Sequence, residues 1–137
     1  MNINSIQDQI IEEFSELNDW LDKYEYLITL GKSHNIYDED LKTDKHLIAG
    51  CQSNVWVKTE INNNNVILKA DSDALITRGI ISLLLRVLNN QTADDITHAD
   101  LYFLDKIGLK SNLSPSRANG LAAIVKQIQS YAAEIGA

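Results

Sequence analysis

Two β-rich segments flank a run of four asparagines in the middle of a chain whose other apolar residues follow helical spacing. Residues 55–61 and 66–70 are rich in β-branched and aromatic side chains, which favour strands. Asparagine tolerates left-handed backbone, so residues 62–65 are predicted to form the turn between two antiparallel strands. The short apolar segment 47–49 is predicted to add a third strand. A sheet of this kind needs helices on one face to bury its apolar side chains.

Helical patterns occupy both sides of this central region. The widest apolar stripe lies in residues 75–88, so this helix is predicted to be the most buried, with Ser72 or Asp73 as its N-cap. Ser5 is predicted to start the first helix, Asn18 or Asp19 the second, which Gly31 ends, and Ser114-Pro115 the last. The 137 residues suit one domain, spanning residues 1–137. The predicted fold class is α+β: a short three-stranded antiparallel sheet covered by helices.

Charge and composition exclude several classes of partner. The chain has 12 basic and 19 acidic residues, a net charge of −7, and residues 1–44 hold eleven carboxylates against three lysines. Nucleic acid and anionic membranes need a basic surface, so neither is an expected partner. No apolar run approaches the ~20 residues of a membrane helix, and no secretory signal is visible. The three histidines, at positions 34, 46 and 98, show no metal-ligand spacing, so no metal site is expected.

The single cysteine, Cys51, has the most distinctive surroundings. It follows Gly50 at the end of a predicted strand and precedes the polar residues 52–54, which places it in a turn. A lone cysteine excludes internal disulfides and suits a reducing, cytoplasmic environment. Lone cysteines are often small buried hydrophobes, but this position favours a reactive thiol. One thiolate can attack a sulfur atom held on another protein and carry it away as a persulfide. Nearby cations would raise the thiolate fraction, and the candidates are Lys45, His46 and Arg117.

Residues 48–57, IAGCQSNVWV, resemble the signature of the SufE family of sulfur acceptors. Further segments are similar in the family's order: residues 20–32, ADSDA at 70–74, Arg78-Gly79, and LSPSRANGL at 113–121. The resemblance covers roughly residues 15–130. GCQSxVW, ADSDA and SPSRxNGL are specific when they occur together.

This resemblance implies a compact α+β domain related to the IscU-type scaffold proteins. It implies that Cys51 accepts persulfide sulfur from a pyridoxal-phosphate (PLP) cysteine desulfurase of the SufS type. It also implies that the protein stimulates that enzyme and passes sulfur to a SufBCD-type iron–sulfur cluster assembly complex. A member that serves a CsdA-type desulfurase is equally compatible. No cofactor is expected on this chain, because PLP belongs to the partner. The expected state is a monomer or weak dimer.

Four residues are candidates to support Cys51. His46 is a possible base or a bystander, and Arg117 either reaches the Cys51 loop or the desulfurase, or pairs with a surface carboxylate. Asp73 either caps its own helix, the interpretation favoured by its position, or anchors the Cys51 loop. Gln52, with Ser53, is a candidate to hold the loop by hydrogen bonds.

Two alternatives to sulfur transfer stay open. The first is a docking module that activates a desulfurase without carrying sulfur, with Cys51 merely buried. The second is an independent thiol enzyme. A cysteine hydrolase needs a base and an oxyanion hole, for which the sequence offers no signature.

Overall fold

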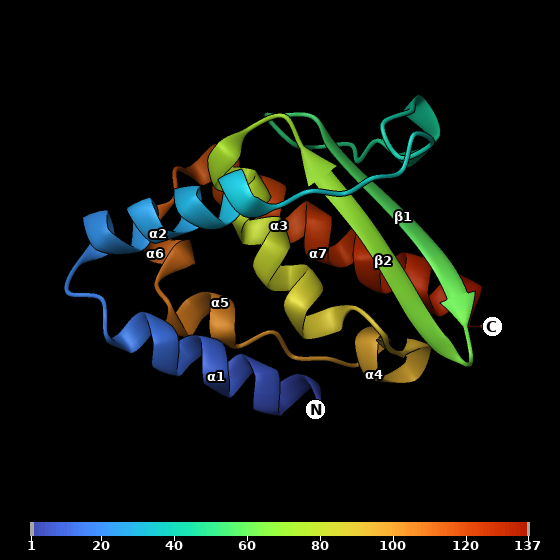
Figure 1. Cartoon of the computed structure of the whole chain (residues 1–137), viewed down its shortest axis with the longest axis horizontal. Coiled ribbons are helices and arrows are strands. Elements are labelled where there is room, and N and C mark those ends of the chain that lie inside the picture. Colours follow the sequence, from blue (N-terminus) through green and yellow to red (C-terminus); the bar gives the residue numbers. More distant parts are fainter. Residues whose placement is uncertain (1, 137) are drawn as a thin grey trace.

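A long β-hairpin forms one wall of the domain (Figure 1). The computed structural model describes residues 2–136. Strands β1 (Val55–Asn62) and β2 (Asn65–Ser72) pair antiparallel from Val55 opposite Ser72 to Asn62 opposite Asn65. Asn63 and Asn64 make the turn, with φ of 52° and 69°. The predicted hairpin is confirmed, because these asparagines adopt the left-handed backbone that a two-residue hairpin turn requires.

The third strand lies elsewhere than predicted. Residues 47–49 form no strand: Leu47 makes an isolated bridge to Trp56, and the chain then turns away at Gly50, where φ is 86°. The third strand is β3 (Gln91–Thr92), which pairs antiparallel with β2 to give the order β1-β2-β3. Asn90, at φ 61°, turns the chain back onto β2. A two-residue strand carries no periodic pattern, so sequence alone offered no sign of it.

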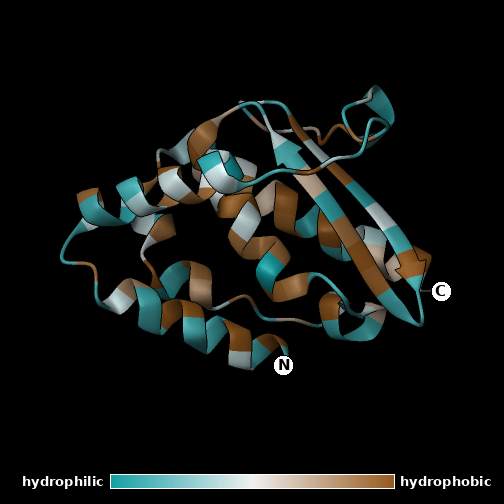
Figure 2. Ribbon diagram, in the orientation of Figure 1, coloured by the Kyte–Doolittle hydropathy of each residue, from teal (hydrophilic) through white to brown (hydrophobic). Residues whose placement is uncertain are grey.

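Helices cover one face of the hairpin, which confirms the α+β class (Figure 1). The longest, α7, packs against β1, while α3 packs against β2 and separates it from α1 and α2. Eight residues of α3 are buried, more than in the other helices of the described range, and Figure 2 shows it as a largely apolar ribbon at the centre. The helices are α1 (Ile3–Ser15), α2 (Trp20–Ser33), the 3-10 turn η1 (Asp44–His46), α3 (Leu75–Leu88), α4 (Ala93–Thr97), α5 (Phe103–Lys106), α6 (Leu109–Asn112) and α7 (Pro115–Ile135).

Helix starts follow the capping prediction in two cases. Asp19 accepts the backbone N–H of Asp22, and Ser114 accepts that of Arg117 with Pro115 at the first helical position. The other two assignments are wrong. Asn2 rather than Ser5 caps α1, and the N-cap of α3 is Ala74, which offers no side-chain hydrogen bond. Ser72 and Asp73 lie before α3 and make contacts elsewhere.

Gly31 does not end α2, which continues to Ser33. Its role is close packing against α3. A Cβ atom on Gly31 would lie 2.2 Å from the Leu75 carbonyl oxygen, and one on Gly79 would lie 2.0 Å from the Leu27 carbonyl oxygen. The two helices therefore cross backbone against backbone, and each glycine is required by the other helix.

Residues 34–46, here called the strap, cross the face of the hairpin opposite the helices. Lys58 and Lys69 are direct cross-strand partners on this face, and like charges in that arrangement destabilise a sheet. The Asp38 carboxylate lies 3.0 Å from the Lys58 Nζ and 3.1 Å from the Lys69 Nζ. Asp38 thus offsets the repulsion between both lysines, together with Glu60 at 3.4 Å and 3.8 Å, and it attaches the strap to the sheet.

An Asp38→Asn variant is expected to unfold at a lower temperature than the parent chain at neutral pH. Hydrogen bonds from Lys58 and Lys69 lower the pKa of Asp38 to about 2. A lowered pKa stabilises the fold above the ordinary carboxyl pKa of about 3.9, and this contribution disappears as pH falls towards 2. The difference in melting temperature should therefore shrink between about pH 4 and pH 2. An unchanged difference at pH 2, or an equal effect of Glu39→Gln, would contradict this.

Candidate functional site

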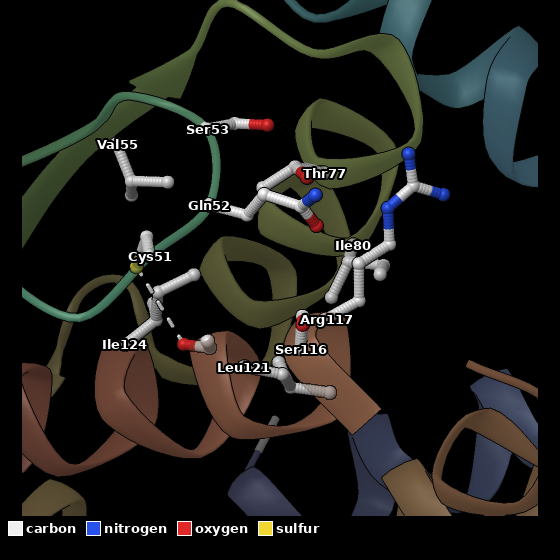
Figure 3. A pocket seen from close by; sticks show the side chains of 11 residues that line it. Cys51, Gln52, Ser53, Val55, Thr77, Ile80, Ser116, Arg117, Leu121 and Ile124 are labelled. Atoms are coloured by element: carbon white, nitrogen blue, oxygen red, sulfur yellow. Dashed lines mark hydrogen bonds between the residues drawn. The ribbon is translucent and has the colours of Figure 1, made fainter. Parts of the chain in front are cut away.

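Cys51 lies in a short loop between the start of β1 and the N-terminal half of α7 (Figure 3). Gly50 supplies the left-handed backbone at one end of this loop, residues 50–54. The thiol is half-buried, and its Sγ donates a hydrogen bond to the Gly120 carbonyl oxygen at 3.7 Å. The sulfur therefore faces α7 and is partly shielded from solvent.

A small cavity opens beside the Cys51 sulfur (Figure 3). Its volume is about 30 Å³, more than the ~10–15 Å³ needed to hold one water molecule. Apolar side chains from three elements supply much of its wall, so the space is a poor environment for ions and water. The lining residues are Cys51, Gln52, Ser53, Val55, Thr77, Ile80, Ser116, Arg117, Gly120, Leu121 and Ile124.

Burial raises the pKa of the Cys51 thiol above its ordinary value. The apolar surroundings disfavour the thiolate, and the expected cations do not offset this effect. Lys45 and His46 instead contact Asp40, at 3.1 Å and 3.4 Å. The prediction that nearby cations raise the thiolate fraction is therefore wrong for this conformation, in which the thiol is protonated at neutral pH.

The free protein should react slowly with iodoacetamide. Only the thiolate attacks the reagent, so the raised pKa lowers the alkylation rate at neutral pH. The rate should continue to increase as the pH is raised beyond about 8.5. Mass spectrometry of samples quenched over time gives the rate, and the same chain unfolded in urea is the matched control, expected to react faster. A rate that levels off below about pH 8 would mean a lowered pKa and would contradict the burial of this thiol.

Asp73 contacts the Cys51 loop rather than the start of α3. Its Oδ1 accepts the backbone N–H of Asn54 at 3.1 Å, and its own N–H donates to the Asn54 carbonyl oxygen at 3.3 Å. The Ser72 hydroxyl donates to that same carbonyl oxygen at 2.7 Å. Of the two roles considered for Asp73, these contacts are those of an anchor, and the favoured capping role is wrong. The loop is thus held firmly at Asn54.

The other predicted side chains divide between the cavity and the strap. Gln52 and Arg117 line the cavity, and in Figure 3 Arg117 lies across it from Cys51. Within residues 2–136, the Arg117 guanidinium makes no ion pair, and neither Gln52 nor Ser53 makes a side-chain hydrogen bond. His46 contacts Asp40, with no hydrogen bond to Cys51. Arg117 is therefore an unpaired positive charge at the rim of the cavity, across from the thiol.

Sequence reasoning did not propose the other residues of the cavity wall as site residues: Val55, Thr77, Ile80, Ser116, Gly120, Leu121 and Ile124. Thr77 and Ile80 belong to α3, and only the packing of α3 beside α7 brings them to Cys51. Gly120 could have been noticed from the sequence, because a glycine inside a helix lowers helix stability and usually has a packing or functional role.

The described residues hold neither a cluster of metal ligands nor a membrane-spanning helix. Between residues 2 and 136, no three His, Cys, Asp or Glu side chains converge as metal ligands. No helix within that range is long and apolar enough to cross a bilayer.

Comparisons with known proteins agree with this architecture. Residues 8–132 match the SufE family, described as an Fe-S metabolism associated domain. An uncharacterised SufE-like protein of Rhizobium etli is 39% identical over 130 residues, covering 91% of this chain and 88% of that protein. A second SufE-like protein, from Rhizobium meliloti, is 37% identical and covers 91% and 93%.

A solved structure supports the fold independently. The solution structure of a hypothetical protein from Thermus thermophilus superposes with a TM-score of 0.77, covering 95% of both chains at 18% identity. At that identity the likeness concerns the fold alone. The functional class is inferred from the sequence matches. Membership of the SufE family implies interaction with a cysteine desulfurase. The chain belongs to the SufE family and has a role in iron–sulfur metabolism.

Proposed function

We propose that this protein is a sulfur acceptor that takes persulfide sulfur from a PLP cysteine desulfurase of the SufS type onto Cys51. It stimulates that enzyme and passes the sulfur to SufBCD-type cluster assembly machinery in the cytoplasm. One observation carries the proposal: the Cys51 thiol lies in a loop with a glycine at one end and faces an apolar cavity with free volume beside the sulfur. A CsdA-type desulfurase would use the same site.

The chemistry is an exchange between two sulfur atoms. The Cys51 thiolate attacks the terminal sulfur of a persulfide on the desulfurase, a new S–S bond forms on Cys51, and the desulfurase cysteine leaves as a thiolate. The proton of the transferred sulfur travels with it or is lost to solvent. No net oxidation occurs, so the step needs no external oxidant. The reverse arrangement, with an acceptor thiolate attacking the Cys51 persulfide, delivers the sulfur.

The loop must move for this exchange. The thiol that rests against α7 is protonated and half-buried, which protects it but lowers its reactivity. Gly50 offers backbone freedom at one end, while Asn54 is anchored by Asp73 at the other. Docking of the desulfurase is expected to turn Cys51 outward, where solvent and the partner's groups lower its pKa. The unpaired Arg117 guanidinium beside the cavity is a source of positive charge for the departing or arriving sulfur.

Intact-mass spectrometry tests the proposal. The protein is incubated with a SufS-type desulfurase and cysteine, and one adduct of about 32 Da is expected, removable by a dithiol. Cys51→Ser should abolish the adduct. An unmodified wild-type chain after many desulfurase turnovers would contradict the proposal.

One observation favours an alternative, a docking module that activates the desulfurase without carrying sulfur: burial raises the Cys51 pKa, as for a structural cysteine. Under this alternative Cys51→Ser still increases desulfurase turnover. Under sulfur transfer the variant loses the stimulation that depends on removing sulfur from the enzyme. Turnover is measured as alanine formed from cysteine, with and without reductant.

A further inference from the structure

Gly120 occupies a position where glycine is costly and where the resting fold does not need it. It lies inside α7, beyond the first turn of the helix, and a glycine there stabilises a helix less than alanine does. Its φ is not left-handed, unlike those of Gly50 and Gly108. Backbone conformation therefore gives no reason for a glycine at this position.

Packing in the resting structure gives no reason either. A Cβ atom on Gly120 would meet only Cys51 within 4 Å: its Cα at 3.7 Å, its Sγ at 3.9 Å and its Cβ at 4.0 Å. These are ordinary van der Waals separations. By contrast, a Cβ atom added to Gly31 would lie 2.2 Å from a backbone oxygen, and one added to Gly79 would lie 2.0 Å from another. Gly120 is thus a helix glycine with room for a side chain, and the room faces the thiol.

We propose that Gly120 keeps free the space that the terminal sulfur of a Cys51 persulfide occupies when the loaded loop lies against α7. This inference rests on the proposed sulfur transfer and adds the residue that determines whether the cargo fits. Persulfide formation adds one atom at about 2.05 Å from Sγ, with the S–S bond formed and the donor thiolate released. A terminal sulfur directed towards Gly120 would lie well inside contact distance of a Cβ placed 3.9 Å from Sγ.

The apolar cavity explains what the space is for. Val55, Ile80, Leu121 and Ile124 line the cavity beside Cys51, and its volume of about 30 Å³ accepts an atom slightly larger than a water molecule. A sulfur held there is shielded from thiols in solution, which would otherwise reduce it and release hydrogen sulfide. With alanine at position 120 the loaded loop cannot settle against α7, so the persulfide stays exposed.

The test compares Gly120→Ala with wild type and with Asn119→Ala, a matched change at the preceding position of the same helix. Each protein is loaded by desulfurase and cysteine, freed of small molecules, and treated with dithiothreitol, which converts the persulfide to thiol and hydrogen sulfide while the dithiol is oxidised. Intact mass follows the loss of the adduct. Gly120→Ala should lose it about tenfold faster than wild type, and Asn119→Ala within about twofold of it.

Two further measurements distinguish a loss of room for the terminal sulfur from a general loss of folding stability. Unloaded Gly120→Ala should melt at or above the wild-type temperature, because alanine favours the helix; a lower melting temperature would overturn the inference, since packing would then require the glycine. Ile124→Val, which removes one methyl group from the same cavity, should slow the loss when combined with Gly120→Ala. Equal adduct lifetimes in wild type and Gly120→Ala would also overturn it. If the wild type forms no adduct, the proposed function itself fails.

Discussion

Gly79→Ala is expected to destabilise the domain by about 3 kcal/mol or more, a large part of the roughly 5–15 kcal/mol typical of a small protein. The added Cβ would lie 2.0 Å from the Leu27 carbonyl oxygen, which is backbone and cannot rotate away. Helices α2 and α3 must therefore separate along their crossing, where Leu27 and Ile80 are buried. The loss of packing between them exceeds the gain of about 1 kcal/mol in helix propensity.

Urea denaturation followed by circular dichroism measures this loss. Gly31→Ala, whose Cβ would lie 2.2 Å from the Leu75 carbonyl oxygen, should behave in the same way. Gly120→Ala is the internal control, since the same substitution inside a helix there meets only ordinary contacts. Equal unfolding free energies for Gly79→Ala and Gly120→Ala would show that the helices do not cross as described.

Arg78→Met is expected to cost about 3 kcal/mol, the second large effect. Asp71 is buried, with 6% of its side chain exposed, and the Arg78 Nε lies 3.0 Å from its Oδ1, although not aligned for a hydrogen bond. Arg78 also donates to the carbonyl oxygen of His34 at the end of α2. Its removal leaves Asp71 with the exposed Lys42, at 3.4 Å, as its remaining cation. A buried carboxylate that loses its nearest cation is strongly destabilising, because an exposed lysine offsets less of the cost of burying the charge.

The double variant Asp71→Asn/Arg78→Met distinguishes charge from packing. Removing both charges should restore part of the stability lost in Arg78→Met, because no buried carboxylate then remains without its nearest cation. Thermal and urea denaturation of both single variants and the double variant form a double-mutant cycle. Additive losses would mean that Arg78 acts through its contact with His34 and not through Asp71.

The predictions that failed share a cause. Residues 47–49 have the composition of a strand, but the turn at Gly50 leaves one bridge, from Leu47 to Trp56. Asp73 has the residue type and position of a helix cap, but the neighbouring end of the Cys51 loop competes for its carboxylate. Both outcomes depend on segments that are distant in sequence, which local propensity does not describe.

The sequence predicted where the candidate site lies, but it did not predict the chemical environment of the thiol. The pattern around Cys51 indicated a turn with a thiol, and the structure places the residue in a loop facing α7. Lys45 and His46, which precede it, were candidates to activate the thiol, yet both contact Asp40 in the strap. Residues from α3 and α7 instead bury the sulfur and raise its pKa.

By itself, the amino-acid sequence determined the hairpin with its asparagine turn, the central apolar helix and the Ser114-Pro115 start of the last one. These features depend on side-chain periodicity and local backbone preference, which neighbouring residues express without the rest of the fold. Tertiary structure alone decided the α2–α3 glycine crossing, the second partner of β2 and the cavity beside Cys51. Each of these depends on atoms brought together across dozens of residues, where shape and desolvation outweigh local propensity.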